Sequence, residues 1–201
     1  TKQILIAPSW QKDNICDLCL EELLDSLKKE NNYEITVRPH PQEVRHMKEK
    51  FEALKEKYKG NKNIVIQTDF SANNTIFNAD ILITDWSSIG YEYAYTTKKP
   101  VIFIDTPMKI MNPNYKDIDV EPINIWSRNI IGKSLRTDQL NDINKVIKDF
   151  LNNGDKYEKK INEMLHDSIY NLGNSAEKGA NYIIECIQEQ IKEREIKNEK
   201  N

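Results

Sequence analysis

Five short apolar runs, separated by segments with helical spacing, constrain the fold of this chain more than any other feature. They lie at residues 4–7, 33–37, 64–66, 80–84 and 101–104. Strands that alternate with helices form a parallel sheet with right-handed crossovers. Short runs without polar alternation are typical of strands that are covered on both faces. The sequence therefore predicts an α/β fold, a Rossmann-like, doubly wound parallel sheet.

The segments between and after these runs predict helices. Asp13 or Asn14 can cap the first one. The expected helices span residues 14–31, 42–58, 74–79, 88–96, 138–152, 157–171 and 175–194. We expect one nucleotide-binding domain over residues 1–188 and a polar tail over residues 189–201 that frays at its end. The chain does not begin with Met, which indicates a domain cut from a longer protein.

Composition argues against several classes of protein. The net charge is only -3 over 201 residues, without the basic excess of a nucleic-acid-binding surface. No apolar stretch reaches the length of a membrane span, and no signal peptide is visible. Cys16 and Cys19 have the spacing of a redox pair, but Cys19 falls on the apolar stripe of its helix. We therefore expect buried helix residues there, with no metal site and no cofactor.

Polar and aromatic residues follow four of the predicted strands. In a doubly wound sheet, ligands bind beyond the carboxyl ends of the strands, so these residues can converge. They are Ser9 and Trp10, Arg38 to His40, Thr68 and Asp69, and Asp85 to Ser88.

Ser87 and Ser88 stand directly before a predicted helix. Hydroxyl groups beside the free N–H groups of a helix N-terminus suit a phosphate or pyrophosphate. Simple capping of the helix is the alternative. Glu92, one turn into the helix, is placed either to accept the hydroxyls of a ribose or to be solvated.

Arg38 and His40 leave the end of the second strand between two prolines, which fix the backbone there. Arginine can clamp phosphate oxygens, and histidine can donate to them or transfer a proton. The alternative is a surface salt bridge and a histidine satisfied by the backbone. We expect His46 and His166 to be solvated. Trp10 and Trp86 either flank a nucleobase or pack against the sheet edge.

Taken together, these segments resemble the CDP-glycerol glycerophosphotransferase family, which includes the poly(glycerol phosphate) polymerases of wall teichoic acid and related capsule enzymes. The resemblance covers residues 4–184, nearly the whole chain. It rests on Ala-Pro-Ser-Trp at 7–10, Arg-Pro-His-Pro at 38–41, residues 80–88, Tyr-Ala at 93–94, residues 99–103 and residues 171–176.

The resemblance implies a GT-B enzyme, with this chain as its carboxyl-terminal, donor-binding domain. By position, His40 would contact the donor phosphates with Arg38 in support, and Ser87 and Ser88 would bind the pyrophosphate. Glu92 would match an acidic ribose-binding position, although aspartate is frequent there. Asp85 would shape its loop, next to Trp86 where tyrosine is commoner. Ser9 and Thr68 are looser candidates for donor contacts.

The resemblance also implies the partners. The donor would be CDP-glycerol or a similar nucleotide-linked polyol, and the acceptor a polyol phosphate or polysaccharide. A missing amino-terminal GT-B domain would carry the other catalytic histidine, and no catalytic metal is needed. We expect a cytoplasmic protein, peripheral at the inner face of the cell membrane. Lys109, Lys116 and Arg128 either meet a polyanionic acceptor or lie in a solvated loop.

Two other classes stay open. One is a GT-B sugar transferase, or a nucleotide-sugar epimerase, that uses a UDP- or CMP-linked donor. The other is a module that serves only for interaction or regulation. Preference for cytidine over uridine nucleotides separates the first class from a glycerophosphotransferase, and failure to bind any nucleotide would favour the second.

Overall fold

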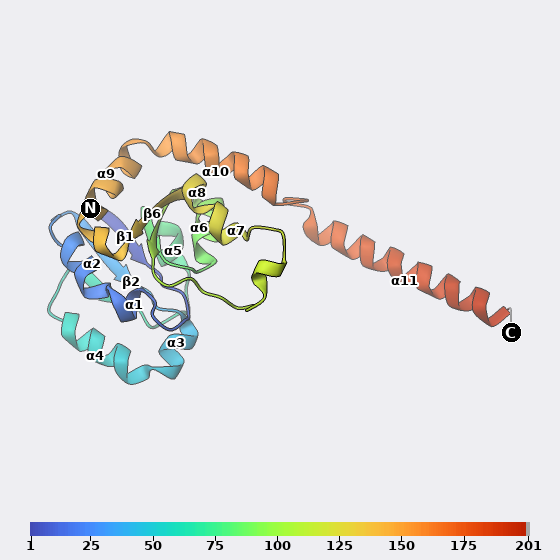
Figure 1. Cartoon of the computed structure of the whole chain (residues 1–201), viewed down its shortest axis with the longest axis horizontal. Coiled ribbons are helices and arrows are strands. Elements are labelled where there is room, and N and C mark those ends of the chain that lie inside the picture. The colour runs from blue at the N-terminus through green and yellow to red at the C-terminus, as the bar shows by residue number, and fades with distance from the viewer. Residues whose placement is uncertain (200–201) are drawn as a thin grey trace. The chain divides into compact units, whose positions relative to one another are not determined.

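A computed structural model describes residues 1–199 (Figure 1). It contains a six-stranded parallel sheet in the order β3-β2-β1-β4-β5-β6. The prediction of a doubly wound parallel sheet is confirmed. The strands are β1 Lys2–Ile6, β2 Tyr33–Val37, β3 Ile64–Ile66, β4 Ile81–Thr84, β5 Val101–Asp105 and β6 Gly132–Arg136.

The sixth strand, β6, was not expected from the sequence. Its residues are Gly-Lys-Ser-Leu-Arg, and only Gly132 and Leu135 are buried. This edge strand has one neighbour, β5, and thus lacks the apolar run of a central strand. Gly132 is needed where the strand begins, because a Cβ atom there would collide with the carbonyl oxygen of Val101.

Three of the expected helices are broken, and the one expected over residues 138–152 is divided into η2 Thr137–Asp142 and α9 Ile143–Asn152. The helix expected to reach residue 31 ends at Leu27 and is interrupted at Cys19, giving α1 Ile15–Leu18 and α2 Leu20–Leu27. The one expected over residues 42–58 is interrupted at Met47, giving α3 Pro41–His46 and α4 Lys48–Tyr58. Short helices follow: α5 Asn74–Asn78, α6 Ile89–Thr97, η1 Tyr115–Asp117, α7 Ile123–Trp126 and α8 Arg128–Ile131.

Helices cover both faces of the sheet. Ile4 and Ile6 of β1 pack in one core with the apolar stripes of α2 and α9 (Ile143–Asn152). Leu5 and Leu82 point to the opposite face and are fully buried, and α6 packs there against β4 and β5. The parallel sheet with both faces covered explains why its central strands are apolar throughout.

The chain divides into two compact units, Thr1–Asn162 and the residues from Glu163 onward. After β6 come η2 Thr137–Asp142, α9, α10 Gly154–Ser168 and α11 Ser175–Glu199. Residues 189–199 of the expected tail belong to α11, and residues 200–201 lie outside the described part. The predicted domain boundary at residue 188 thus falls within a helix. None of the helices over residues 1–199 is long and apolar enough to cross a membrane.

Candidate functional site

The loops after β1, β2 and β4 meet around a small cavity of about 160 Å³, here named the His40 cavity. Of the residues singled out in the sequence, Arg38, His40 and Ser87 line it. Its other lining residues are Ala7, Pro8, Pro39, Pro41, Ile76 and Ile89. The predicted convergence of post-strand residues is therefore observed for three of them.

His40 lines this cavity from the start of α3. It is the N-cap of α3, where its Nδ1 accepts a hydrogen bond of 3.2 Å from the backbone N–H of Gln42. Burial and the positive charge of Lys109 lower the pKa of His40. Since Nδ1 is an acceptor, the proton of the neutral ring lies on Nε2, which is then free to donate to a ligand oxygen.

Arg38 is held away from solvent by the segment before α5. Its guanidinium donates to the carbonyl oxygen of Ala72 and to Oδ1 of Asn73, both at 3.0 Å, and lies over the ring of Phe70. Burial lowers its pKa. Arg38 is thus no surface ion pair: it shapes the β2 side of the cavity and anchors the segment that leads into α5.

Ser87 and Ser88 stand at the N-terminus of α6, as expected. Ser87 is half-buried, and its Oγ accepts a long hydrogen bond of 3.4 Å from the N–H of Ile89. Ser88 is the exposed N-cap residue, and in the described chain its side chain makes no capping hydrogen bond. Simple capping therefore accounts poorly for Ser88. Gly90 lets this turn approach the sheet, because a Cβ atom there would lie 2.7 Å from the Phe103 ring.

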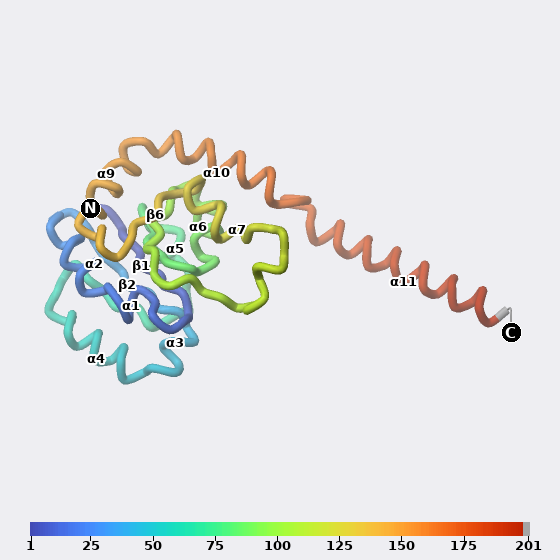
Figure 2. The backbone as a smooth tube through the Cα atoms, viewed as in Figure 1, coloured from blue at the N-terminus to red at the C-terminus, as the bar shows by residue number. Residues whose placement is uncertain are grey.

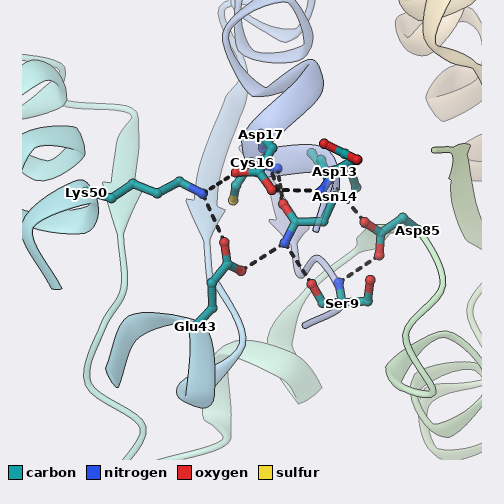
Figure 3. Close-up of polar contacts among 9 residues, drawn as sticks. Ser9, Asp13, Asn14, Cys16, Asp17, Glu43, Lys50 and Asp85 are labelled. Carbon is teal, nitrogen blue, oxygen red and sulfur yellow. Dashed lines mark hydrogen bonds and ion pairs between the residues drawn. The ribbon is translucent and has the colours of Figure 1, made fainter. Parts of the chain in front are cut away.

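The Asp85 carboxylate holds the loop after β4 in place by hydrogen bonds to the backbone. This buried carboxylate accepts a hydrogen bond of 2.7 Å from the N–H group of Ser9 (Figure 3). It also accepts from the N–H groups of Trp86 at 2.7 Å and Ile15 at 3.1 Å. It joins the loop after β1 to the loop after β4. Because Asp85 is only 1 % exposed, it acts on a ligand through the loop geometry.

A second set of buried polar side chains connects the loop after β1 to α3. Asn14 donates to the carbonyl oxygen of Ser9 at 2.8 Å and to the Glu43 carboxylate at 2.9 Å (Figure 3). Lys50 binds Glu43 at 3.0 Å and Asp17 at 2.6 Å. Burial raises the pKa of Glu43, and Lys50 opposes that shift. The network ties the β1 loop to the helix that His40 caps.

Arg128 holds the β4 loop from the other side, which corrects the expectation of a solvated or anion-facing side chain. It is 5 % exposed and lies between the rings of Trp86 and Phe103, 4.2 and 4.6 Å from their centroids. It donates to the carbonyl oxygen of Asp85 at 2.9 Å and to Asp105 at 2.6 Å. Arg128 and Asp85 are 43 residues apart, so no local pattern could have predicted this contact.

The remaining candidates do not line the His40 cavity. Ser9 is buried, and its hydroxyl has no hydrogen-bond partner among the described residues. Thr68 is half-buried after β3, and Glu92 is exposed on α6. Trp86 packs against Arg128, in line with the alternative that it packs at the sheet edge, and its Nε1–H donates to the carbonyl oxygen of Thr106. The binding roles of these side chains stay predictions.

The cysteines behave as packing residues. Burial raises the pKa of Cys19 to about 12 and that of Cys16 further, so both thiols stay protonated at neutral pH. Within residues 1–199, no group of three or more His, Cys, Asp or Glu side chains is arranged to hold a metal ion.

The parallel sheet with helices on both faces defines the class of fold, a Rossmann-like domain of the type that forms one half of a GT-B fold. The C-terminal domain of LpcC, a glycosyl transferase group 1 family protein from Francisella tularensis, matches with a TM-score of 0.51 and 15% identity, over 83% of this chain and 85% of that one. The C-terminal CMP-Kdo binding domain of WaaA from Acinetobacter baumannii matches with a TM-score of 0.50 and 11% identity, over 82% and 89%.

The sequence places the chain in a particular family within this class. The family described as CDP-glycerol:poly(glycerophosphate) glycerophosphotransferase matches residues 1–185. The chain belongs to this family of transferases. It is also 31% identical to the minor teichoic acid biosynthesis protein GgaB of Bacillus subtilis (strain 168), over 51% of this chain. The chain spans 13% of the length of that curated relative.

Proposed function

We propose that this chain is the donor-binding domain of a glycerophosphotransferase and that the His40 cavity holds the pyrophosphate of CDP-glycerol. The observation that carries the proposal is that His40 and Ser87, from two loops, line one cavity at the N-terminus of α6 in a member of this family. UDP- or CMP-linked sugars are the competing donors, because the fold is shared with sugar transferases.

The electrostatics of the cavity favour a pyrophosphate. The first turn of α6 presents the positive end of the helix dipole, and the N–H groups of Ile89 and Gly90 make only long hydrogen bonds of 3.4 and 3.3 Å to Ser87. Ser88 adds an exposed hydroxyl there, and neutral His40 adds its Nε2–H group. The buried Asp85 and Arg128 hold this loop in place before any ligand binds. Donors fixed in advance stabilise charge without reorganising during the reaction.

The proposed reaction is an in-line phosphoryl transfer. The hydroxyl oxygen of the acceptor forms a bond to the phosphorus that carries glycerol, and the bond from that phosphorus to the oxygen of CMP breaks. The electron pair leaves with CMP, whose growing negative charge His40 and the α6 N-terminus would stabilise. The proton of the acceptor hydroxyl passes to a base in a part of the enzyme outside this chain.

We further propose that the acceptor is a polymer of the cell envelope. This step rests on family membership and on the likeness to GgaB, whose name places that protein in teichoic acid biosynthesis. The proposed setting is the inner face of the cytoplasmic membrane, with an amino-terminal GT-B domain completing the cleft. Donor binding is the part of the activity that this chain can be tested for directly.

Calorimetric titration of the purified chain with CDP-glycerol, beside UDP-glucose, tests the proposal. We expect saturable binding of CDP-glycerol and weaker or no binding of UDP-glucose. His40→Ala removes one donor to a charged oxygen and should weaken binding roughly tenfold to a hundredfold. The double variant Ser87→Ala/Ser88→Ala should weaken it at least about tenfold for the same reason. His166→Ala, an exposed histidine on α10, is the matched control and should bind as the parent does.

Each other outcome has a defined meaning. Tighter binding of UDP-glucose would move the chain to sugar transfer. Binding of CDP-glycerol that is unchanged by His40→Ala and by the serine variant would place the donor outside the His40 cavity. Absence of binding to either nucleotide would contradict the proposed donor-binding role of this chain.

A further inference from the structure

A second, larger cavity of about 530 Å³ lies beside the His40 cavity and is named here the Trp10 cavity. Its walls come from the loop after β1, the end of α3 and the segment after β5. Trp10 connects the two cavities, because its ring lies nearly parallel to that of His40, with 5.9 Å between centroids and 16° between planes. A molecule in the Trp10 cavity would thus lie one aromatic layer away from the proposed phosphate position.

Trp10 gives this cavity an aromatic wall. The side chain is 48% exposed, which is high for a tryptophan in a loop packed against a sheet. His46 lies nearly parallel to it on α3, with 6.1 Å between the ring centroids. Met47 and Met111 add further exposed apolar surface. A cavity of this size and lining is typical of a small-molecule site.

The charges around the cavity balance, which argues against a site for an anion. Asp13, Asp17 and Glu43 supply carboxylates, and Lys12 and Lys109 supply ammonium groups. Lys50 binds both Asp17 and Glu43 from behind. The lining therefore lacks the positive excess that a phosphate would require.

Hydrogen-bonding groups on the wall are suited to hydroxyls. The side-chain oxygen of Gln11 is buried and has no hydrogen-bond partner among the described residues, while its Nε2 donates to the carbonyl oxygen of Pro107 at 3.0 Å. The Asp13 carboxylate lines the same cavity. Both are acceptors, and the hydroxyl groups of a sugar or polyol are donors.

We propose that the Trp10 cavity binds an uncharged, polyhydroxylated unit of the acceptor, with Trp10 as its stacking surface. The C–H groups of such a unit lie against the indole ring, and its hydroxyls donate to Asp13 and Gln11. The inference rests on the proposed function, since it places the acceptor beside the donor. His40 would then stand between the two substrates.

Tryptophan fluorescence of the whole chain tests this inference, with methyl α-D-glucopyranoside and ribitol as uncharged probes and glucose 6-phosphate as the anionic counterpart. We expect a saturable change in the millimolar range with at least one uncharged probe. Trp10→Ala should abolish it, and Trp10→Phe should retain binding in calorimetry. Asp13→Asn should weaken binding roughly threefold to tenfold, the effect of one hydrogen bond. The matched control is Trp126→Phe, at a tryptophan that does not line the cavity.

Several results would overturn the inference. They are no saturable change up to 100 mM probe, a change that survives in Trp10→Ala, or tighter binding of the phosphorylated sugar. Loss of probe binding when CDP-glycerol is saturating would also do so, because the two cavities would then be one site. Circular dichroism of each variant checks folding. Calorimetry with CDP-glycerol, run in parallel, reports separately on the proposed donor site.

Discussion

The loops after β4 and β5 are adjacent at the carboxyl edge of the sheet, yet they are built in opposite ways. The β4 loop is held by two buried side chains, Asp85 and Arg128, which are 1% and 5% exposed. The Asp85 carboxylate accepts backbone hydrogen bonds, and Arg128 donates to the Asp85 carbonyl oxygen. The segment that follows β5 is a long loop, drawn in yellow-green in Figure 2. In this segment Met111 is 82% and Val120 is 73% exposed. The first loop is fixed before a ligand arrives, as a phosphate-binding turn needs to be. The second has few buried contacts, which is typical of a segment of low local stability.

The largest effect should follow removal of the Asp85 carboxylate. Asp85→Ala leaves the buried N–H groups of Ser9, Trp86 and Ile15 without their acceptor. Each such group costs about 1–3 kcal/mol, so we expect a loss of roughly 3 kcal/mol or more in the free energy of unfolding, measured in urea. Asp85→Asn keeps one acceptor oxygen and should lose less. A loss below about 1 kcal/mol in Asp85→Ala would show that the loop is not held by this carboxylate.

Replacement of Arg128 should lower the free energy of unfolding by less than Asp85→Ala does. Arg128→Met keeps apolar volume between Trp86 and Phe103 but leaves the carbonyl oxygen of Asp85 without its donor. We expect a loss of about 2 kcal/mol, because Asp105 stays partly solvated when its partner is removed. Arg136→Met is the matched control, since its ion pair with Asp138 is exposed on both sides. An equal loss in both variants would contradict the role of burial at Arg128.

How well the sequence predicts a strand of this sheet depends on how deeply the strand is buried. Central strands such as β4 are apolar throughout because helices cover both faces, so the pattern alone identifies them. The edge strand β6 has only Gly132 and Leu135 buried and carries no such pattern. The breaks at Cys19 and Met47 depend on how short helices pack, which periodicity does not report.

For the site, the sequence predicted that the loops after β1, β2 and β4 meet, but it also included the loop after β3, whose Thr68 and Asp69 do not line the His40 cavity. It did not predict what each side chain does. His40 and Ser87 line one cavity because parallel strands end at one edge of the sheet. Arg38 also binds the carbonyl oxygen of Ala72, 34 residues away, a contact that the sequence did not predict, and its role toward phosphate stays a prediction. Asn14 and Glu43 are likewise joined over 29 residues. Such long-range polar contacts depend on the tertiary fold and have no local signature.

The smallest effect is expected in the exposed segment after β5, where one change can be compared at two positions. Val120→Ser alters a side chain that is 73% exposed and should change the free energy of unfolding by less than about 0.5 kcal/mol. Val101→Ser makes the same change at a fully buried position of β5 and should cost at least about 2 kcal/mol, from lost packing and a buried hydroxyl. Urea denaturation of both variants measures the difference. A loss above about 1 kcal/mol at Val120 would mean that the segment after β5 is packed in solution as firmly as the β4 loop, and the contrast between the two would fail.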